Sequence, residues 1–330
     1  MEIGRMLKRF FRSKSMSLIF INIAVIIFFY LLNNNYLNKD NIRGMMNTVS
    51  TAGILGVGVA FLLMGGGMDL AAGAEGCFGA VVVALLMRAG IPWPIAILLG
   101  LVFGIIAGGI NSFFVNKLNF MGFITTLGMS SIYGGLSLVI SNNNNIAIND
   151  QTFWKMGSYA VFGIFPMPFV IMVFLIIIYG FILAKTRFGR SILMCGGNRQ
   201  AARLAGLNPK RIVTILYMNC AMLATLSGSV LAARMHNASP TALSSAALSA
   251  ITASVLGGVS FMGGGGNISG LFFGLLLLNS FNNGLIVIEV PSYWQVVTQG
   301  GLLIIALCVD FFSTRARDAS LKKSRMTKTA

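Results

Sequence analysis

Charge is scarce in this chain. Only 10% of its 330 residues are Asp, Glu, Lys or Arg, whereas soluble globular domains carry about 25%. Hydrophobic residues make up 56% of the sequence, and the mean hydropathy is +0.83. So few charges exclude a water-soluble globule and indicate a chain that is embedded in a lipid bilayer.

Residues that carry catalytic chemistry are equally scarce. The chain has one histidine, His236, and its four cysteines lie far apart, without the CxxC or Cys/His spacing of a metal site. No GxxxxGK[ST] motif is present, so the chain has no phosphate-binding loop of its own. We predict a non-catalytic chain without metal or cofactor, in which any ATP and magnesium are bound by another subunit.

Apolar runs recur along the whole sequence. A membrane-crossing helix needs about 20 apolar residues, and the runs predict ten such helices within one transmembrane domain over residues 1–330. The fold class is therefore an all-α polytopic membrane protein. The first run ends at residue 32, and the others are centred on 45–64, 69–87, 93–114, 121–140, 164–184, 212–233, 245–261, 268–288 and 293–312.

Basic residues gather in three segments beside these runs: residues 1–15, the loop 185–211 and residues 313–330. Cytoplasmic segments of membrane proteins carry an excess of lysine and arginine. Ten spans place both termini, and the loop between spans six and seven, on one side of the membrane. All three segments are predicted to be cytoplasmic, so the net charge of +16 reflects topology and not nucleic-acid binding.

Two glycine-rich breaks interrupt the spans, MGGGMDLAAG at 64–73 and MGGGGNISG at 262–270. Glycine at this density destabilises a helix, and the span count places both breaks on the cytoplasmic side. Their likeness fits either an internal duplication or two ordinary glycine hairpins. The residues of interest in them are Gly65, Gly66, Gly67, Asp69, Gly263 and Gly264.

Other glycines recur every fourth residue inside spans. Gly100, Gly104 and Gly108 share one helix face, as do Gly270 and Gly274. Small residues at this spacing allow helix backbones to approach closely. We therefore predict close helix packing at both places.

Two carboxylates, Asp69 and Glu75, lie in or at the edge of the spans without an obvious basic partner. An intramembrane carboxylate is a functional candidate by default. We interpret Asp69 as a cap for the helix that follows the first break, and the sequence offers no account of Glu75. The alternative is an ion-gradient-driven secondary transporter that uses Asp69 or Glu75 for coupling.

Hydroxyl and amide side chains within the spans are candidates for a solute path, because they exchange hydrogen bonds without holding a solute too tightly. The same groups also hold helices together, and the sequence favours neither role. Thr126 and Ser130 share a helix face at i, i+4 spacing, as do Asn279 and Asn283. The full set is Asn111, Thr126, Ser130, Asn219, Asn279, Asn282 and Asn283.

Start and stop signals for one short helix lie in the loop 185–211. Asn198 caps the stretch RQAARLA, Gly206 ends it, and Pro209 follows. The apolar side chains of this helix, beside Arg199 and Arg203, fit either insertion into a groove of a partner protein or contact with anionic lipid; they are Ala201, Ala202, Leu204 and Ala205. The residues predicted to make this contact are Asn198, Arg199, Ala201, Ala202, Arg203 and Gly206.

Several ordered motifs resemble one family, the permease subunits of ribose-type ABC importers for simple sugars. They cover residues 45–312. Several ordered motifs over that length are far more specific than any one of them. The motifs are GGGMDLAAG, GGINSFFVNKLNFMGFITTLGMSSIYGGL, TRFGRSILMCGGNRQAARLAGLNPKRI, LAARMHNASPTA, LGGVSFMGGGGNISG and LLNSFNNGLIVIEVPSYWQ.

The resemblance implies import of a simple sugar or a related small hydroxylated solute across the inner membrane of a prokaryote. It also implies three partners: a second permease copy or close paralogue, an ATP-binding cassette ATPase subunit, and an external solute-binding protein. The short helix is then similar to the coupling helix of the family, and Ala202→Glu is expected to uncouple transport without changing the fold. A non-transporting scaffold or channel is a further alternative.

Three positions depart from the family pattern. Ala247, Leu248 and Ser249 stand where a Glu-Leu-Asp run is common, Ala71 stands in place of a serine, and Gly265 in place of a basic residue. Polar groups are lost at all three sites. The sequence therefore leaves open which solute is carried and whether the second permease is identical to this chain.

Overall fold

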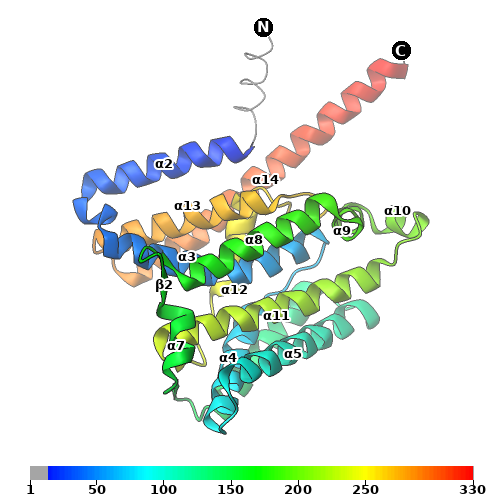
Figure 1. Cartoon of the computed structure of the whole chain (residues 1–330). Helices are drawn as coiled ribbons and strands as arrows, with labels where there is room; N and C mark the ends of the chain where they lie inside the picture. The colour runs from blue at the N-terminus through cyan, green and yellow to red at the C-terminus, as the bar shows by residue number, and fades with distance from the viewer. Residues whose placement is uncertain (1–13, 330) are drawn as a thin grey trace.

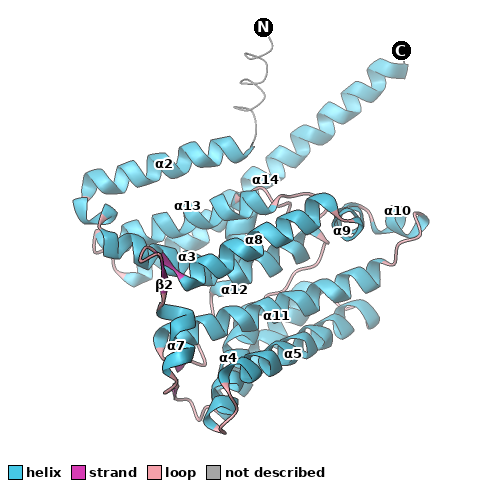
Figure 2. Ribbon diagram, viewed as in Figure 1, coloured by secondary structure: helices cyan, strands magenta, loops and turns pink. Residues whose placement is uncertain are grey.

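The computed structural model describes residues 14–329, and most of this part of the chain is helical (Figures 1 and 2). Residues 1–13, most of the expected N-terminal tail, lie outside the described residues. The α-helices in chain order are α2 (Lys14–Leu32), α3 (Lys39–Met64), α4 (Ala72–Arg88), α5 (Trp93–Ser112), α6 (Gly122–Ile140), α7 (Gln151–Ser158), α8 (Met167–Lys185), α9 (Arg187–Gly197), α10 (Arg199–Leu204), α11 (Pro209–Met235), α12 (Ala246–Leu256), α13 (Ile268–Val287) and α14 (Ser292–Thr329).

Short elements of other types complete the described chain. The 3-10 helix η1 (Asn34–Leu37) follows α2, and the π-helix η2 (Phe113–Lys117) continues α5. Strand β1 (Ile146–Ala147) pairs antiparallel with β4 (Asn237–Ala238), and β2 (Ala160–Val161) pairs antiparallel with β3 (Phe165–Pro166). The strands lie near α7, at the end of the bundle opposite α9 and α10 (Figure 2).

Six described helices are long and apolar enough to cross a membrane: α3, α5 with η2, α6, α8, α11 and α13. The apolar parts of α2 and α14 are shorter, 18–32 and 292–308, and α4 has 17 residues. α14 continues through the expected C-terminal tail to Thr329. Each of the ten apolar runs therefore contains a helix. Ten complete crossings and the side of each terminus stay predictions.

The run 245–261 does not form the expected continuous span. α12 has only 11 residues, which measure about 16 Å, against a hydrocarbon core of about 30 Å. The chain before α12 is not helical, and the buried Leu243 in it donates its N–H to the Cys77 thiol of α4 (3.1 Å). Non-helical backbone at this depth is tolerated because protein, and not lipid, surrounds it.

Helix α11 occupies the centre of the bundle, where it packs against α3, α4 and α5 (Figure 1). α12 packs against α3 and α13, and α8 covers the other side of α3. Large apolar side chains are exposed on the peripheral helices, for example Leu98 on α5, Ile124 on α6 and Phe174 on α8. This arrangement is expected where the outer helices face lipid and the inner helices face protein.

Glycines set the helix separations, as predicted. A Cβ atom on Gly104 or Gly108 of α5 would collide with backbone atoms of α11, and one on Gly270 or Gly274 of α13 would collide with backbone carbonyls at the end of α12. The expected close packing at both places is confirmed.

Adding one methyl group at Gly108 tests this packing. A Cβ there would overlap the Tyr217 carbonyl, so Gly108→Ala should lower the free energy of unfolding by about 1–3 kcal/mol. Gly180→Ala on α8 is the matched control, since nothing lies within 4 Å of its added Cβ. Thermal unfolding in detergent measures both, and equal unfolding temperatures would contradict the α5–α11 contact.

Candidate functional site

The short helix α10 begins at the residue that the sequence indicated and has the predicted cap at each end. The Asn198 side-chain oxygen accepts hydrogen bonds from the N–H groups of Gln200 (2.9 Å) and Ala201 (3.0 Å). Gly206 has a left-handed backbone, φ +79°, and donates its N–H to the Arg203 carbonyl (2.9 Å). Pro209 then begins α11. The predicted helix is confirmed and ends one residue earlier than expected, at Leu204.

The side chains of α10 do not all point the way the sequence suggested. Ala202 is fully buried in the core of the chain, whereas Leu204 is 92% exposed. The expectation that Ala202→Glu leaves the fold unchanged is therefore wrong, because that variant buries a carboxylate. Leu204 belongs to the predicted apolar surface of this helix but was not among the residues predicted to make the contact, although it is the one large apolar side chain in RQAARL. Ala201 and Arg203 are exposed beside it.

Three glycine segments meet at the end of the bundle that carries α10. We call residues 64–66, 196–197 and 263–264 the glycine junction. The Gly264 N–H donates to the Met64 carbonyl (2.9 Å), and a Cβ on Gly66 would lie 3.3 Å from the Gly196 Cα. Cβ atoms at Gly263 and Gly264 would likewise collide with the other two segments. The prediction that both breaks share one end with the loop 185–211 is confirmed.

Helix α10 is hydrogen-bonded directly to this junction. The Arg199 guanidinium donates to the Gly66 carbonyl (3.1 Å). Gly65 and Gly67 continue the end of α3, because their N–H groups donate to the Phe61 (3.1 Å) and Leu62 (2.9 Å) carbonyls. A displacement of α10 therefore acts on the first glycine break through one charge-assisted hydrogen bond.

Beyond the first break, two carboxylates share one amide. Asp69 Oδ2 (3.3 Å) and Glu75 Oε1 (2.8 Å) both accept from the Asn111 side-chain nitrogen. The Tyr133 hydroxyl lies 3.4 Å from the Asn111 side-chain oxygen and 3.1 Å from the Ala107 carbonyl. Asp69, Glu75, Asn111 and Tyr133 form a buried group that we call the carboxylate cluster.

Asp69 also fixes the backbone that leads into α4. Its Oδ1 accepts the N–H of Ala71 (2.8 Å), and Ala71 is the N-cap residue of α4. The interpretation of Asp69 as a cap is thus confirmed in part: it holds the backbone just before the helix, and its second oxygen belongs to the carboxylate cluster. The sequence did not predict that Glu75 and Asn111 join it, because they lie on separate helices.

The other path candidates are dispersed through the bundle. Thr126 is fully buried and its hydroxyl accepts the Leu70 N–H (3.0 Å), while Ser130 is half-buried one turn further on. The Asn219 side chain accepts a hydrogen bond from the Tyr179 hydroxyl.

Three asparagines of α13 lie elsewhere. Asn279 donates to the Leu275 carbonyl (2.9 Å), and Asn283 exchanges two hydrogen bonds with Asn41 (2.9 Å each). The Asn282 oxygen is buried without a partner among residues 14–329. The seven candidates are therefore not gathered around one cavity of this chain, and most of them hold helices together.

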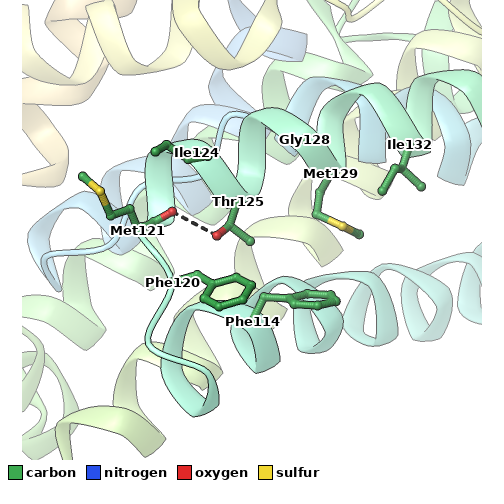
Figure 3. Close-up of a pocket in the computed structure, with 8 residues that line it drawn as sticks. All are labelled: Phe114, Phe120, Met121, Ile124, Thr125, Gly128, Met129 and Ile132. Atoms are coloured by element: carbon green, nitrogen blue, oxygen red, sulfur yellow. Dashed lines mark hydrogen bonds between the residues drawn. The ribbon is translucent and has the colours of Figure 1, made fainter.

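An apolar groove of about 440 Å³ lies between α6 and the end of α5 (Figure 3). Phe114 and Phe120 form one wall, and side chains of α6 form the other. Gly128 leaves the helix surface open there, because nothing lies within 4 Å of a Cβ built on it. The groove is lined by Phe114, Phe120, Met121, Ile124, Thr125, Gly128, Met129 and Ile132.

Long apolar helices, interrupted helices buried in protein, and a capped loop helix attached to glycine breaks define a multi-pass membrane permease. The family described as "branched-chain amino acid transport system / permease component" matches residues 41–307. The chain belongs to this family of permease components. No solved structure matches it.

Curated relatives agree with this assignment. The chain is similar to the ribose import permease protein of Bacillus subtilis (strain 168), 34% identical over 87% of this chain and 89% of that protein. It is similar to the D-allose transport system permease protein of Escherichia coli (strain K12), 34% identical over 87% and 88%. An L-arabinose ABC transporter permease protein of Azospirillum brasilense is 32% identical over 86% and 84%. The resemblance drawn from the motifs is confirmed.

The glycine junction can be tested with two adjacent residues. A Cβ on Gly196 would overlap the Met64 carbonyl, whereas one on Gly197 would lie 3.7 Å from the Gly264 Cα, an ordinary contact. Gly196→Ala should therefore separate the three segments and raise the rate of protease cleavage in the loop 185–211, and Gly197→Ala should not. Limited proteolysis in lipid nanodiscs measures this, and equal cleavage of both variants would contradict the junction.

Proposed function

We propose that this chain is the permease subunit of an ATP-binding cassette importer that carries a simple sugar or a related small hydroxylated solute. The relatives named for ribose, D-allose and L-arabinose transport support the solute class. Hydrolysis of ATP takes place in a separate ATPase subunit, which holds the ATP and magnesium. The chain lies in the inner membrane of a prokaryote. An external solute-binding protein delivers the solute to the end of the bundle that carries α7.

The observation that carries this proposal is the exposed apolar tip of α10. Leu204 is the last residue of α10 and is 92% exposed. Ala202, two residues before it in the same helix, is buried in the core and fixes the helix in place. A single large apolar side chain on a fixed helix suits insertion into a pocket of another protein. Arg199 and Arg203 flank it and are exposed. In this proposal the α10 contact residues of this chain lie in a groove of the ATPase.

Closure of the ATPase then displaces α10 relative to the bundle. The displacement acts on Gly66 through the Arg199 guanidinium, and on Met64 and Gly264 through the backbone contacts of Gly196. Segments in backbone contact cannot absorb a shift by changing a side-chain rotamer, so the ends of α3 and of the second break move with the loop. Access to the path alternates as a consequence.

In this proposal the solute path lies between two permeases and not within one. The polar side chains of this chain are largely engaged with its own backbone and side chains, as Asn111 and Thr126 illustrate. By contrast, α6 presents an apolar groove and three glycines without close neighbours, Gly128, Gly134 and Gly135. This surface suits close approach of α6 from a second copy or a close paralogue.

A second candidate function rests on the carboxylate cluster. Two buried carboxylates, Asp69 and Glu75, suit the ion site of a gradient-driven secondary transporter. ATP dependence separates the two proposals: an importer takes up solute only with its ATPase and ATP, whereas a secondary transporter needs an ion gradient and no ATPase.

Replacing Leu204 by a charged residue tests the coupling contact. Leu204→Glu should abolish co-purification of the ATPase subunit with the tagged chain, because an ionised side chain does not enter an apolar pocket. Phe162→Glu is the matched control, since Phe162 is 89% exposed at the opposite end of the bundle. Quantitative mass spectrometry of gently solubilised membranes measures the ATPase-to-permease ratio.

Uptake assays complete this test. Proteoliposomes with the co-purified wild-type complex and its binding protein should accumulate a labelled sugar only when ATP is supplied inside. Retention of a stoichiometric ATPase by Leu204→Glu would contradict the role of α10, and sugar uptake without any ATPase would favour the ion-coupled alternative.

Disulfide cross-linking tests the second permease. The background is Cys308→Ser, because Cys308 is exposed whereas Cys77, Cys195 and Cys220 are buried. In that background Gly128→Cys should form a disulfide with the same residue of a second copy on mild oxidation. Leu98→Cys on the exposed face of α5 is the control and should stay monomeric. Equal cross-linking at both positions would contradict a specific α6 interface.

A further inference from the structure

The buried Glu75 has no part in the coupling contact or in the proposed dimer surface. It lies in the first turn of α4 and is fully buried. Its Oε1 accepts from the Asn111 amide at 2.8 Å, and the same nitrogen donates to Asp69 at 3.3 Å. Its Oε2 is buried without a hydrogen-bond partner among residues 14–329.

No positive charge faces this pair within the described part of the chain. Asp69 is the charged neighbour of Glu75. Several elements pack against α4, and four of them contain no titratable side chain: α5, α12, β1 and β4. The charged residues of α3 lie in its first turns, near Asn38, at the end of that helix away from the carboxylates. The basic residues of α11 lie in its first and last turns. The titratable groups that face the carboxylates are hydroxyls and a thiol: Tyr133 of α6, and Tyr217 and Cys220 of α11.

Two ionised carboxylates in this position would be strongly destabilising. Both charges would be removed from water without a cation, and they would repel each other through one shared amide. The Asn111 amide group donates two hydrogens and carries no charge, so it cannot compensate for two negative charges. A proton on one carboxyl removes one charge and with it the repulsion.

We propose that Asp69 and Glu75 form a site that binds one proton, carried on Oε2 of Glu75, in the conformation described. Oε2 of Glu75 is the one oxygen of the two carboxyls that accepts no hydrogen bond within residues 14–329, so a proton there displaces none, and Asp69 retains the single negative charge between the Ala71 N–H and the Asn111 amide. The site belongs to this chain alone and does not depend on the importer function proposed above.

The position of the site links proton release to the first glycine break. Residues 68–71 join the glycine junction to α4, and they are held by three contacts: the Tyr217 hydroxyl to the Met68 carbonyl (2.8 Å), the Leu70 N–H to Thr126 (3.0 Å), and the Ala71 N–H to Asp69. Loss of the proton leaves two like charges on Asn111 and repels Asp69 from its place. The conformation of this segment therefore depends on pH.

Infrared difference spectroscopy of the full chain in lipid nanodiscs tests the proposal directly. Wild type minus Glu75→Gln at neutral pH should show the carbonyl stretch of a protonated carboxyl, and this band should shift in deuterated water. Wild type minus Glu289→Gln is the matched control and should lack the band, because Glu289 is exposed in the turn between α13 and α14. Absence of the band from the wild-type spectrum overturns the proposal, and this reading needs no variant to fold.

Thermal unfolding in nanodiscs from pH 5 to pH 9 gives a second, independent readout. Folded wild type retains a proton that the unfolded chain releases, so its stability falls as pH rises until the folded pair also loses its proton. Glu75→Gln lacks this proton. Its unfolding temperature should therefore rise by several degrees relative to wild type as pH increases, and that of Glu289→Gln should follow wild type.

Two further outcomes decide against the proposal. An unfolding-temperature difference between wild type and Glu75→Gln that is constant with pH indicates packing alone. The second outcome is that sodium or potassium chloride stabilises wild type but not Glu75→Gln, and that choline chloride does not have this effect. That result indicates a metal cation in place of the proton. None of these readouts uses ATP or a partner, so a failure here is distinct from a failure of the importer proposal.

Discussion

Backbone-to-backbone contact between glycines is the constraint on which the rest of this structure depends. At the glycine junction, the end of α3, the end of α9 and the second break approach so closely that Cβ atoms at Gly66, Gly196 or Gly264 would meet neighbouring backbone atoms. The same device joins α5 to α11 and α12 to α13. In lipid, helices gain little from hydrophobic burial against one another, so close van der Waals packing of this kind carries the association.

The junction also explains how two distant features are connected. Residues 64–75 run from the Gly66 carbonyl, which Arg199 of α10 contacts, to Glu75 in the carboxylate cluster. Residues 68–71, between these points, are not helical and are held by side-chain hydrogen bonds. The proposed ATPase contact and the proposed proton site therefore lie at the two ends of one short segment.

A chain that encloses its own channel would present unpaired polar groups to an internal cavity. This chain has the opposite distribution of polar and apolar groups. Asn111 and Thr126 are buried and hydrogen-bonded inside the bundle, whereas the outer face of α6 is apolar and open at Gly128. Buried polar groups in a membrane protein are satisfied internally, because lipid offers them no partners. This distribution is the reason for proposing a solute path between this chain and a second permease.

The sequence by itself determined the class of protein, the ten apolar helices, the glycine faces of α5 and α13, and the ends of α10, because composition, spacing and capping are local properties. It failed where distant segments decide the outcome. The burial of Ala202, the break before α12, and the shared amide between Asp69 and Glu75 each depend on contacts between separate helices. Periodicity shows which residues share a face, but only the tertiary structure decides what that face meets.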